Sequence, residues 1–409
     1  MSRKTGQAAK GAGMRTTSAG TNIGGAGEHN RRVVMHGLRI NGTLSRAQIA
    51  RNTGLVPQTV SNIIEELERD GLVTAADPVK AGRGRAATPY SLAPNGAFAY
   101  GMQLDQHRAR VVAIDLLGRR VAAAEATLGP GRLEANIDRI SGVLSQVAGD
   151  LARHAGQKAP RLLGLGLAMP APTGVHAGHD DPWLAGLSND HPLVTRLALQ
   201  TGLPVSLHHD ASAAAVAERL SGSAKGIDNF ALIFVSYGLG AGIYINGELY
   251  RGHHRLAGEL GQVVVQGQEG PVPLEHLTAL VGLIGRLGLQ PNQPDLFDRL
   301  DRAVAEGHPE IALWLDRAAI HLGWAVDLVD CMVDPERVII GGQMPASLLG
   351  RLIAAVLAVR TEGAVDRGNR SLFIVEGSGD PYFVATGAAA EPVTRAFAPS
   401  FSAMLKTSP

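Results

Sequence analysis

The first quarter of the chain shows an apolar pattern with helical spacing three times over. A helix that ends at Asn41-Gly42 is predicted by four spaced apolar residues, which are Val33, Val34, Leu38 and Ile40. Ser45 suits the N-cap of a short second helix that runs through Arg51 and buries Ile49. Pro57 begins the third helix, because the N–H that proline lacks would have no partner in a first helical turn. The expected buried side of this helix is formed by Val60, Ile63, Ile64 and Leu67.

Strand signals follow the third helix. Gly71 ends it, Leu72-Val73-Thr74 predicts a short strand, and "VKAGRGRAATPYSL" predicts a hairpin. Three short helices and a hairpin are typical of a winged helix-turn-helix, whose third helix enters the major groove of DNA. Residues 1–28 are rich in Gly, Ala, Ser and Thr without an apolar period, so we expect them to be disordered and order to begin near Asn30.

Polar side chains in the segment 29–92 are candidates for contacts to DNA. Gln58 and Asn62 lie off the apolar stripe of the third helix, and either amide could pair bidentately with adenine. Arg83 and Arg85 are separated by one glycine and are expected to follow phosphates or a minor groove at the hairpin tip. The expected DNA-binding residues are Ser45, Arg46, Gln58, Thr59, Ser61, Asn62, Arg83 and Arg85. The alternative is a small protein-binding module with a solvated helix and a basic loop; the arrangement and the charge together favour DNA.

From Ala97 the pattern changes to an α/β one that occurs twice. "FAYGMQLDQHRARVVAIDLLGRRVAAAEA" predicts three strands joined by turns, and "NFALIFVSYGLGAGIYINGELYRG" repeats that plan with Asn246-Gly247 as a hairpin signal. The remaining predicted strands are 162–168, 204–208 and 337–340, and the predicted helices are 133–154, 192–201, 211–221, 274–287, 309–331 and one after Gly387. Two such halves facing each other form a cleft, which is the usual place for a small ligand.

Length and composition place these elements in a multidomain globular protein. The chain has 409 residues, of which 45% are hydrophobic and 18% charged, so two or three domains are expected. No apolar run is long enough to cross a bilayer, and the N-terminus lacks the apolar segment of a secretory signal. We therefore expect a cytoplasmic protein without a membrane partner. Cys331 is the single cysteine, which excludes an internal disulfide and a cysteine-based metal site within one chain.

The net charge of +1 conceals an asymmetry between the two parts of the chain. Residues 1–90 hold 13 Lys and Arg against 6 Asp and Glu, whereas the rest hold 25 against 31. A basic N-terminal part on an acidic body indicates that the N-terminal part meets a polyanion.

Six stretches, in order and spacing, resemble the ROK family (repressors, open reading frames and kinases), and specifically its sugar-responsive repressors with an N-terminal winged helix. They are "TGLVPQTVSNIIEELERDGLV", "GLGLAMPAP" at 164–172, "HHDASAAAVAE" at 208–218, "GLGAGIYINGELYRGHHRLAGELGQ" at 238–262, "RVIIGG" at 337–342 and "ATGAAA" at 385–390. The resemblance runs from about Asn30 to the last helix. It implies an actin-like (ribonuclease H-like), two-lobed sugar kinase fold, usually dimeric, with a monosaccharide between the lobes.

The resemblance also shows where this chain departs from a kinase. The first phosphate loop of the family reads Asp-x-Gly-Gly-Thr-Lys, whereas this chain has "DQHRAR" at 105–110. Glycines are needed where backbone N–H groups must approach a phosphate, because a Cβ blocks that approach. In the second loop Gly238, Gly240 and Gly242 remain, but Ser236 and Tyr237 stand at the Gly-Thr positions of the family. Phosphoryl transfer depends on positioning and charge neutralisation, so most of the rate should be lost.

The sugar side is better preserved. By resemblance Asp210 matches the catalytic base of the kinases, and Glu259 and Glu275 match two sugar-binding glutamates. A carboxylate can accept hydrogen bonds from two adjacent hydroxyls, which fixes the stereochemistry of a sugar. His209 stands where the family has asparagine, and Gln262 replaces a histidine that bridges sugar and zinc. The zinc loop has become "GQEGPVPLEH", with prolines to stiffen it and no cysteine, so we expect neither zinc nor another cofactor.

Each of these residues has a simpler interpretation. Asp210 could only cap the helix expected to begin at Ala211, and Glu259 and Glu275 could be ordinary surface acids. His209 and Gln262 depart from the family pattern and could indicate a different ligand or none. The pair His253-His254 is interpreted as solvent-facing loop histidines rather than metal ligands.

Taken together, the sequence predicts a disordered basic tail at 1–28, a winged helix-turn-helix at 29–92 and a ROK sugar-kinase-like domain for effector binding and dimerisation at 93–409. The predicted function is a non-enzymatic repressor of carbohydrate-utilisation genes. It would bind an inverted-repeat DNA operator as a homodimer or higher homo-oligomer, with a monosaccharide or related carbohydrate at His209, Asp210, Glu259, Gln262 and Glu275. The alternatives are an ATP-dependent sugar kinase with a regulatory DNA-binding part, and a constitutive DNA-binding protein with a vestigial cleft.

Overall fold

The protein is an α/β structure made of two compact units. The computed structural model describes residues 23–77, 87–105, 107–129, 133–170, 192–291, 293–363 and 373–397. One unit, called the head, comprises Met1–Glu68, Ala75–Ser91 and Phe397–Pro409; the other, called the body, comprises Arg69–Thr74 and Leu92–Ala396. Among the described residues, no helix combines the length and the apolar character that a membrane crossing requires.

The N-terminal elements form a winged helix-turn-helix. They are α1 (Ile23–Asn41), β1 (Leu44–Ser45), α2 (Arg46–Thr53), α3 (Pro57–Arg69), β2 (Val73–Ala75) and β3 (Pro89–Leu92), and the three strands form one sheet in the order β1-β3-β2. The predicted capping of α2 is confirmed: the Ser45 side chain accepts from the N–H of Gln48, and the Gln48 side chain accepts from the N–H of Ser45. The four apolar residues predicted for the inner side of α3 are all buried.

The predicted start of the first helix is wrong by several residues. Helix α1 begins at Ile23 rather than near Asn30, so the part of the predicted disordered tail from 23 to 28 is helical. This first turn and a half has almost no apolar residues, which left no period to recognise in the sequence. Its backbone is supported instead by an ion pair one turn apart, 2.6 Å between Arg32 Nη2 and Glu28 Oε1. Residues 1–22 lie outside the described residues.

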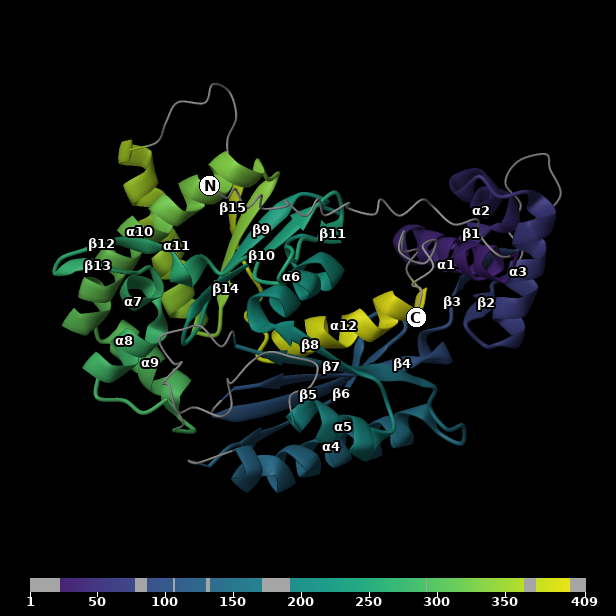
Figure 1. The fold of residues 1–409 in the computed structure, drawn as a ribbon, viewed down its shortest axis with the longest axis horizontal. Helices are drawn as coiled ribbons and strands as arrows, with labels where there is room; N and C mark the ends of the chain where they lie inside the picture. The colour runs from purple at the N-terminus through teal and green to yellow at the C-terminus, as the bar shows by residue number, and fades with distance from the viewer. Residues whose placement is uncertain are drawn as a thin grey trace, which may run out of the picture. The chain divides into compact units, whose positions relative to one another are not determined.

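The body contains two five-stranded sheets with the same plan, which confirms the predicted duplication (Figure 1). The first has the order β6-β5-β4-β7-β8 and the second the order β11-β10-β9-β14-β15. In each, three antiparallel strands from one continuous stretch are followed by two parallel strands. The strands are β4 (Phe98–Leu104), β5 (Arg108–Asp115), β6 (Arg120–Thr127), β7 (Leu162–Met169), β8 (Val205–His209), β9 (Phe230–Val235), β10 (Leu239–Ile245), β11 (Glu248–Leu249), β14 (Arg337–Gly342) and β15 (Phe373–Glu376).

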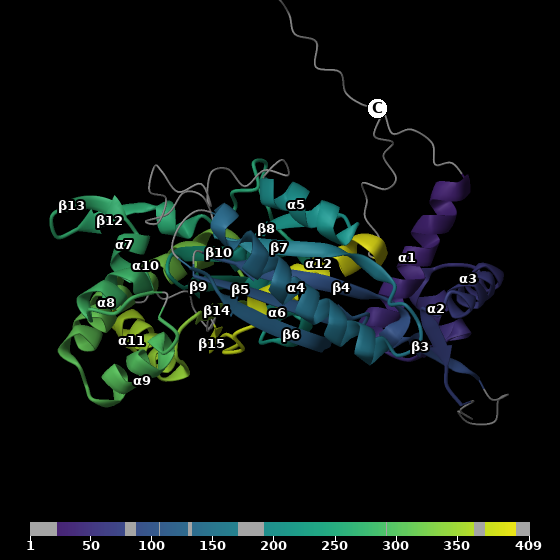
Figure 2. The same cartoon turned by 90° about the horizontal axis from the view of Figure 1, so that it is seen from below.

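Helices α4 (Leu133–Ala155) and α5 (Pro192–Thr201) cover one face of the first sheet (Figure 2). Helices α6 (Asp210–Ser221) and α12 (Phe383–Phe397) lie between the two sheets. Glycines make this close packing possible: a Cβ on Gly101 would lie 2.0 Å from the carbonyl oxygen of Ala385, and one on Gly387 would lie 1.8 Å from that of Ala213. The last helix begins at Phe383, whereas the sequence predicted a start after Gly387. Gly387 instead lies inside this helix, where it packs against α6.

One short helix, η1 (Pro94–Gly96), lies at the start of the first lobe. The remaining elements belong to the second lobe of the body, and they are η2 (Leu260–Gln262), the hairpin β12 (Val264–Gly267) and β13 (Gly270–Pro273), α7 (Glu275–Thr278), α8 (Leu280–Arg286), α9 (Leu296–Ala305), α10 (Pro309–Val333) and α11 (Ala346–Gly363). The single helix predicted at 274–287 is wrong, because Ala279 is extended and separates α7 from α8. The side chain of Trp314 is fully buried, and its Nε1–H donates to the carbonyl oxygen of Ala279 at 3.4 Å. This hydrogen bond gives a partner to a backbone carbonyl at the break. Helices α9 and α11, strand β15 and the β12–β13 hairpin were not predicted.

Candidate functional site

The turn between β4 and β5 is closed by its own side chains. Asp105 Oδ1 accepts hydrogen bonds from the backbone N–H groups of His107 at 2.7 Å and Arg108 at 2.8 Å. An aspartate that bonds the backbone two residues on is a common way to fix a tight turn without glycine. The N–H groups that a phosphate-binding loop would turn toward a ligand are thus already used by this carboxylate.

Side chains of this turn also reach the second lobe of the body. The ring of His107 meets the ring of Tyr237 edge-on, with 5.2 Å between their centroids. Tyr237 follows β9, in the turn that matches the second phosphate loop of a kinase, and its hydroxyl donates to the carbonyl oxygen of Pro291 at 3.0 Å. Burial raises the pKa of Tyr237, so the phenol stays protonated and remains a donor. The two turns therefore contact each other through one aromatic side chain from each.

Arginine and glutamine side chains add to this inter-lobe contact. Arg108 Nη2 lies 3.5 Å from the carbonyl oxygen of Gln293, and its Nη1 lies 3.6 Å from Oε1 of Glu125. Gln343, at the end of β14, donates to Oε1 of Gln103 on β4 at 2.8 Å. The contacts of Arg108 with Gln293 and of Gln103 with Gln343 join the first lobe to the second, whereas the Arg108–Glu125 pair lies within the first lobe.

The residues predicted to bind an effector form two linked pairs. His209 is the N-cap of α6, and its Nδ1 lies 3.1 Å from Oε1 of Glu259. Gln262, in η2, donates from Nε2 to Oε1 of Glu275 at 2.8 Å. The departures from the family pattern at 209 and 262 thus each give a partner to one of the two glutamates. His209 and Gln262 hold Glu259 and Glu275 in place, which is a clear structural role for both residues.

Glu275 is buried and is packed closely by a glycine on each of two sides. Its side chain is 3% exposed, and it begins α7. A Cβ on Gly238 would lie 3.3 Å from Oε2 of Glu275, and one on Gly261 would lie 3.2 Å from it. Gly238 of the second loop and Gly261 of η2 therefore pack closely against this carboxylate, and Glu275 is not the ordinary surface acid of the simpler interpretation.

Asp210 lies close to two other acidic groups. It is the first residue of α6, and its Oδ1 accepts from the N–H of Ala211 at 2.6 Å. Burial raises the pKa of Asp210 to about 6, the Ala211 N–H and His209 act in the opposite direction, and the charges of Glu259 and Asp105 add to the rise. The helix begins one residue before the predicted start, with His209 rather than Asp210 at the N-cap position. Asp105, absent from the predicted site, belongs to this group of carboxylates.

His208 is a second residue that the sequence did not single out. It is buried on β8, with Nε2 3.0 Å from Oγ of Ser206 and Nδ1 3.3 Å from Nη1 of Arg251. Burial and the charge of Arg251 lower its pKa to about 3, so this histidine is neutral. The two adjacent histidines of "HHD" could have indicated this difference. Neighbouring residues of a strand point to opposite faces, so His208 and His209 are expected to have different surroundings.

The residues present do not fit the zinc site of the family. Val264–Gly267 and Gly270–Pro273 form a hairpin without cysteine, and the amide of Gln262, in place of histidine, donates to a carboxylate. In the described ranges, no group of three or more His, Cys, Asp or Glu is placed to hold a metal ion. His253 and His254 contact each other edge-on, with 4.5 Å between ring centroids, and both are exposed.

In the head, two of the predicted DNA-binding residues contact each other on the surface of α3. Gln58 Nε2 donates to Oδ1 of Asn62 at 3.0 Å, and both side chains are exposed. Thr59 and Ser61 are half-buried neighbours. Arg46 pairs with Glu65 at 3.2 Å and lies 5.2 Å from the centre of the Tyr90 ring. Ser45 is engaged in its cap, and Arg83 and Arg85 lie outside the described residues.

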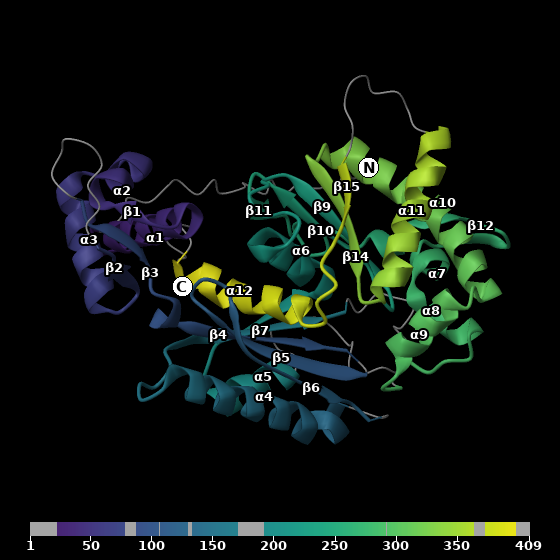
Figure 3. The same cartoon turned by 180° about the vertical axis from the view of Figure 1, so that it is seen from behind.

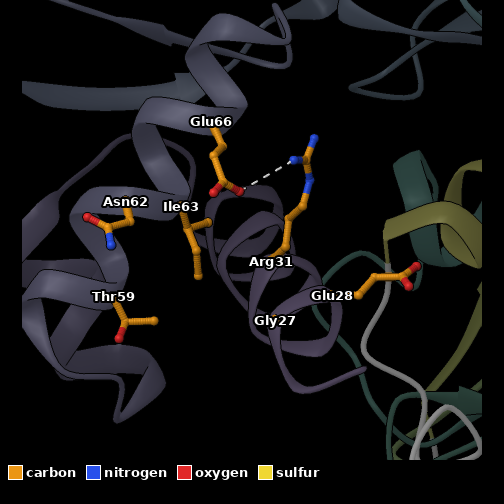
Figure 4. Close-up of a pocket in the computed structure, with 7 residues that line it drawn as sticks. All are labelled: Gly27, Glu28, Arg31, Thr59, Asn62, Ile63 and Glu66. Atoms are coloured by element: carbon orange, nitrogen blue, oxygen red, sulfur yellow. Dashed lines mark ion pairs between the residues drawn. The ribbon is translucent and has the colours of Figure 1, made fainter. Parts of the chain in front are cut away.

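A groove of about 390 Å³ separates α1 from α3 (Figure 4). Thr59, Asn62, Ile63 and Glu66 line it from α3, and Glu66 pairs with Arg31 of α1 at 3.9 Å. The described residues up to position 90 hold six Lys and Arg and six Asp and Glu. The seven basic residues that make residues 1–90 positive therefore all lie at 1–22 and 78–86.

Comparisons with known proteins agree with this geometry. The model described as "ROK family" matches residues 132–380, and the model described as "Winged helix-turn-helix DNA-binding" matches residues 38–74. The chain is 36% identical over 162 residues to the bifunctional enzyme NanE/NanK of Brucella suis, a stretch that is 40% of this chain and 30% of that enzyme. It is 26% identical over 245 residues to the xylose repressor of Bacillus subtilis, covering 58% of this chain and 60% of the repressor. The chain thus spans less than two thirds of either relative.

A solved structure shares nearly the whole fold. It is described as a ROK family transcriptional regulator, homolog of the E. coli MLC protein, and superimposes with a TM-score of 0.69 at 20% identity. The match covers 91% of this chain and 97% of that one. It supports the combination of a winged helix-turn-helix and a two-lobed body on one chain.

Proposed function

Because this chain belongs to the ROK family, we propose that it is a DNA-binding transcriptional regulator that senses a small carbohydrate without modifying it. The observation that carries the proposal is that one chain joins a winged helix-turn-helix to a kinase-like body in which His107 and Tyr237, from the two turns that resemble phosphate loops, contact each other. The similarity to a xylose repressor and to a ROK transcriptional regulator supports it.

The proposed recognition of DNA uses two kinds of contact. Gln58 and Asn62 of α3 would read base edges, since paired amides suit adenine in the major groove. The basic residues at 78–86 and in the N-terminal 22 would contact phosphates, which carry affinity but no sequence information. As a homodimer the protein would place two copies of α3 about 34 Å apart on an inverted repeat.

The proposed effector site consists of Asp210, Glu259 and Glu275 with the supporting residues His209 and Gln262. Glu259 and Glu275 are already oriented by these partners, and Asp210 lies near Glu259 and Asp105. A monosaccharide offers adjacent hydroxyls that such carboxylates accept from, and each charged hydrogen bond is stronger than a neutral one. Binding that favours one arrangement of the lobes by about 1 to 3 kcal/mol would change DNA affinity roughly 5- to 150-fold.

A sugar kinase with a regulatory DNA-binding part is the second candidate. Asp210 favours it, because a carboxylate whose pKa is about 6 suits a general base near neutral pH, and one relative is named as a bifunctional enzyme. The closed turn at Asp105 and the His107–Tyr237 contact argue against it, since phosphoryl transfer needs backbone N–H groups free to bind phosphate.

DNA selection from a random-sequence pool tests the proposal. The full chain should enrich an inverted repeat, and binding measured by fluorescence anisotropy should weaken as salt rises, because phosphate contacts release counterions. Binding with no sequence preference would contradict the regulator and leave the kinase hypothesis to be tested by ADP release.

A further inference from the structure

The segment between β11 and η2, residues 250–259, contacts strand β8 of the first lobe near both of its ends. Arg251, near its start, places Nη1 3.3 Å from Nδ1 of His208. Glu259, at its end, places Oε1 3.1 Å from Nδ1 of His209. Neighbouring residues of a strand point to opposite faces, so the segment holds β8 from both sides. Strand β8 is the last in the order of the first sheet, so a segment of the second lobe can reach both of its faces.

The 250–259 segment is fixed to strand β10 of the second lobe. At its start the N–H of Tyr250 donates to the carbonyl oxygen of Ile243 at 2.8 Å. At its end the N–H of Ala241 donates to the carbonyl oxygen of Gly258 at 2.7 Å. Glycine is required at 258, because its φ is 94° and a Cβ would lie 1.9 Å from the carbonyl oxygen of Ala241. The segment is therefore part of the second lobe, and its contacts with β8 cross between the lobes.

The contact between Arg251 and His208 has a defined donor and acceptor. Burial and the charge of Arg251 lower the pKa of His208 to about 3, so the ring is neutral and one of its nitrogens accepts. Arginine only donates, hence Nδ1 of His208 accepts from Arg251, and Nε2–H donates to Oγ of Ser206 at 3.0 Å. Nη2 of Arg251 lies 4.0 Å from Oε1 of Glu391 on α12, the helix between the two sheets (Figure 3). One guanidinium thus links the segment to a strand and a helix.

We propose that Arg251 is a positioning residue of the effector site: by holding the 250–259 segment on β8, it sets where Glu259 lies relative to His209 and Asp210. The proposal rests on the proposed function, in which Glu259 binds the carbohydrate, and it assigns no ligand contact to Arg251 itself. A single inter-lobe contact at Glu259 would allow the segment to pivot over β8, whereas two contacts fix its distance and its direction. A carboxylate that is positioned in advance loses less conformational entropy when a sugar binds.

A double-mutant cycle on carbohydrate affinity tests this role. Arg251→Met keeps the apolar stem and should weaken binding of the monosaccharide with the largest thermal shift about 10-fold, as measured by calorimetry. In a Glu259→Gln background the same change should cost less than about 2-fold, because Arg251 acts through Glu259. Arg360→Met is the matched control, since Arg360 is also a mostly buried, ion-paired arginine, and it should leave the affinity unchanged. No loss from Arg251→Met in the wild type, or an equal loss in both backgrounds, would overturn the proposal.

Rescue at position 208 tests the contact with the strand. His208→Leu removes the acceptor of Arg251 and should weaken carbohydrate binding as much as Arg251→Met does. His208→Gln keeps a neutral acceptor in its amide oxygen and should bind within about 3-fold of the wild type. Equal losses in the two variants at 208 would show that the affinity does not depend on an acceptor for Arg251, and would contradict the proposed contact.

Hydrogen–deuterium exchange tests the segment without any carbohydrate. The amides at 252–258 should exchange about 10-fold faster in Arg251→Met than in the wild type, among them the N–H of Ala257, which donates to the carbonyl oxygen of Arg251 at 3.2 Å. If no carbohydrate in the panel binds, the proposed function fails, yet this measurement still decides whether Arg251 holds the segment. Unchanged exchange at 252–258 in Arg251→Met would overturn the proposal.

Discussion

The rings of His107 and Tyr237 meet edge-on, 5.2 Å between centroids, and so join the two turns where a kinase of this fold holds nucleotide phosphates. Edge-to-face aromatic contacts of this kind are favourable, by about 0.5 to 1.5 kcal/mol beyond the burial of their area. The contact is supported by the hydrogen bond from the Tyr237 hydroxyl to the carbonyl oxygen of Pro291. The two turns that resemble the phosphate loops of the family thus contact each other through their own side chains.

The first prediction is that the protein does not turn over ATP. In a coupled assay for ADP release across a panel of monosaccharides, the rate should stay at background, because Asp105 already occupies the N–H groups of His107 and Arg108. Clear turnover that Asp210→Asn abolishes would contradict this and favour the sugar kinase.

The second prediction concerns the pairing of His209 with Glu259. Glu259→Gln should lower effector affinity about 10- to 100-fold, because a hydrogen bond to a charged group contributes roughly 1.5 to 3 kcal/mol. The probe is the monosaccharide that gives the largest thermal shift in a panel of sugars, sugar phosphates and polyols, and affinity is measured by calorimetry. Glu248→Gln is the control, since Glu248 is an exposed acid on β11. Unchanged affinity in Glu259→Gln would remove Glu259 from the proposed site.

The third prediction separates base contacts from phosphate contacts. Asn62→Ala should reduce the preference for the selected DNA over random DNA by about 1 to 3 kcal/mol, because its amide is exposed on α3 beside Gln58. The double variant Arg83→Ala, Arg85→Ala should instead weaken binding to both DNAs and lower the salt slope by about 0.9 for each phosphate that these arginines neutralise. Anisotropy titrations at several salt concentrations measure both quantities. Equal effects of the two variants on specificity would contradict the assignment.

The fourth prediction follows from the carboxyl group of Asp210. Its pKa is raised from 3.8 to about 6 by burial, so between these values the folded protein binds a proton that the unfolded chain has released. Ionisation of Asp210 therefore lowers the free energy of unfolding as pH rises through that window. The full decrease is reached above about pH 6. Asp210→Asn removes it and should raise the free energy of unfolding by roughly 1 to 3 kcal/mol at pH 7.5 and by little near pH 4.

Denaturant unfolding of the two proteins at both pH values measures this difference. The buried His208 acts in the opposite direction, since its pKa is lowered to about 3 and its contribution to stability is lost as pH falls from 6.5 toward that value. His208 is present in both proteins, so its contribution to the free energy of unfolding cancels when the two are compared. An Asp210→Asn variant no more stable than the wild type at pH 7.5 would show that the carboxyl is not held in an unfavourable environment.

Local signals in the sequence were sufficient for most of the fold. Ser45 and Pro57 placed two helix starts, and Asn246-Gly247 placed a hairpin, because each of these residues acts within a few positions of itself. The repeated strand pattern predicted two similar sheets. The start of α1 and the break at Ala279 were missed, because the first has no apolar period and the second depends on Trp314, 35 residues away in the chain.

The site was predictable in its residues but not in its bonds. The resemblance placed His209, Glu259, Gln262 and Glu275 together, yet only the structure pairs the first with the second and the third with the fourth. The contact between the two turns could not be predicted from the sequence of either turn alone, because His107 and Tyr237 are far apart in the sequence and belong to different lobes. A contact of this kind depends on how the lobes pack.

The measurement that tests the central claim most directly is a titration of selected operator DNA with the full chain, with and without the monosaccharide identified by thermal shift. The account predicts that the sugar changes the apparent Kd for operator by about 5- to 150-fold and that Glu259→Gln removes the change while operator binding itself persists. An apparent Kd that stays the same at saturating sugar would contradict the claim that this protein is a sugar-sensing regulator.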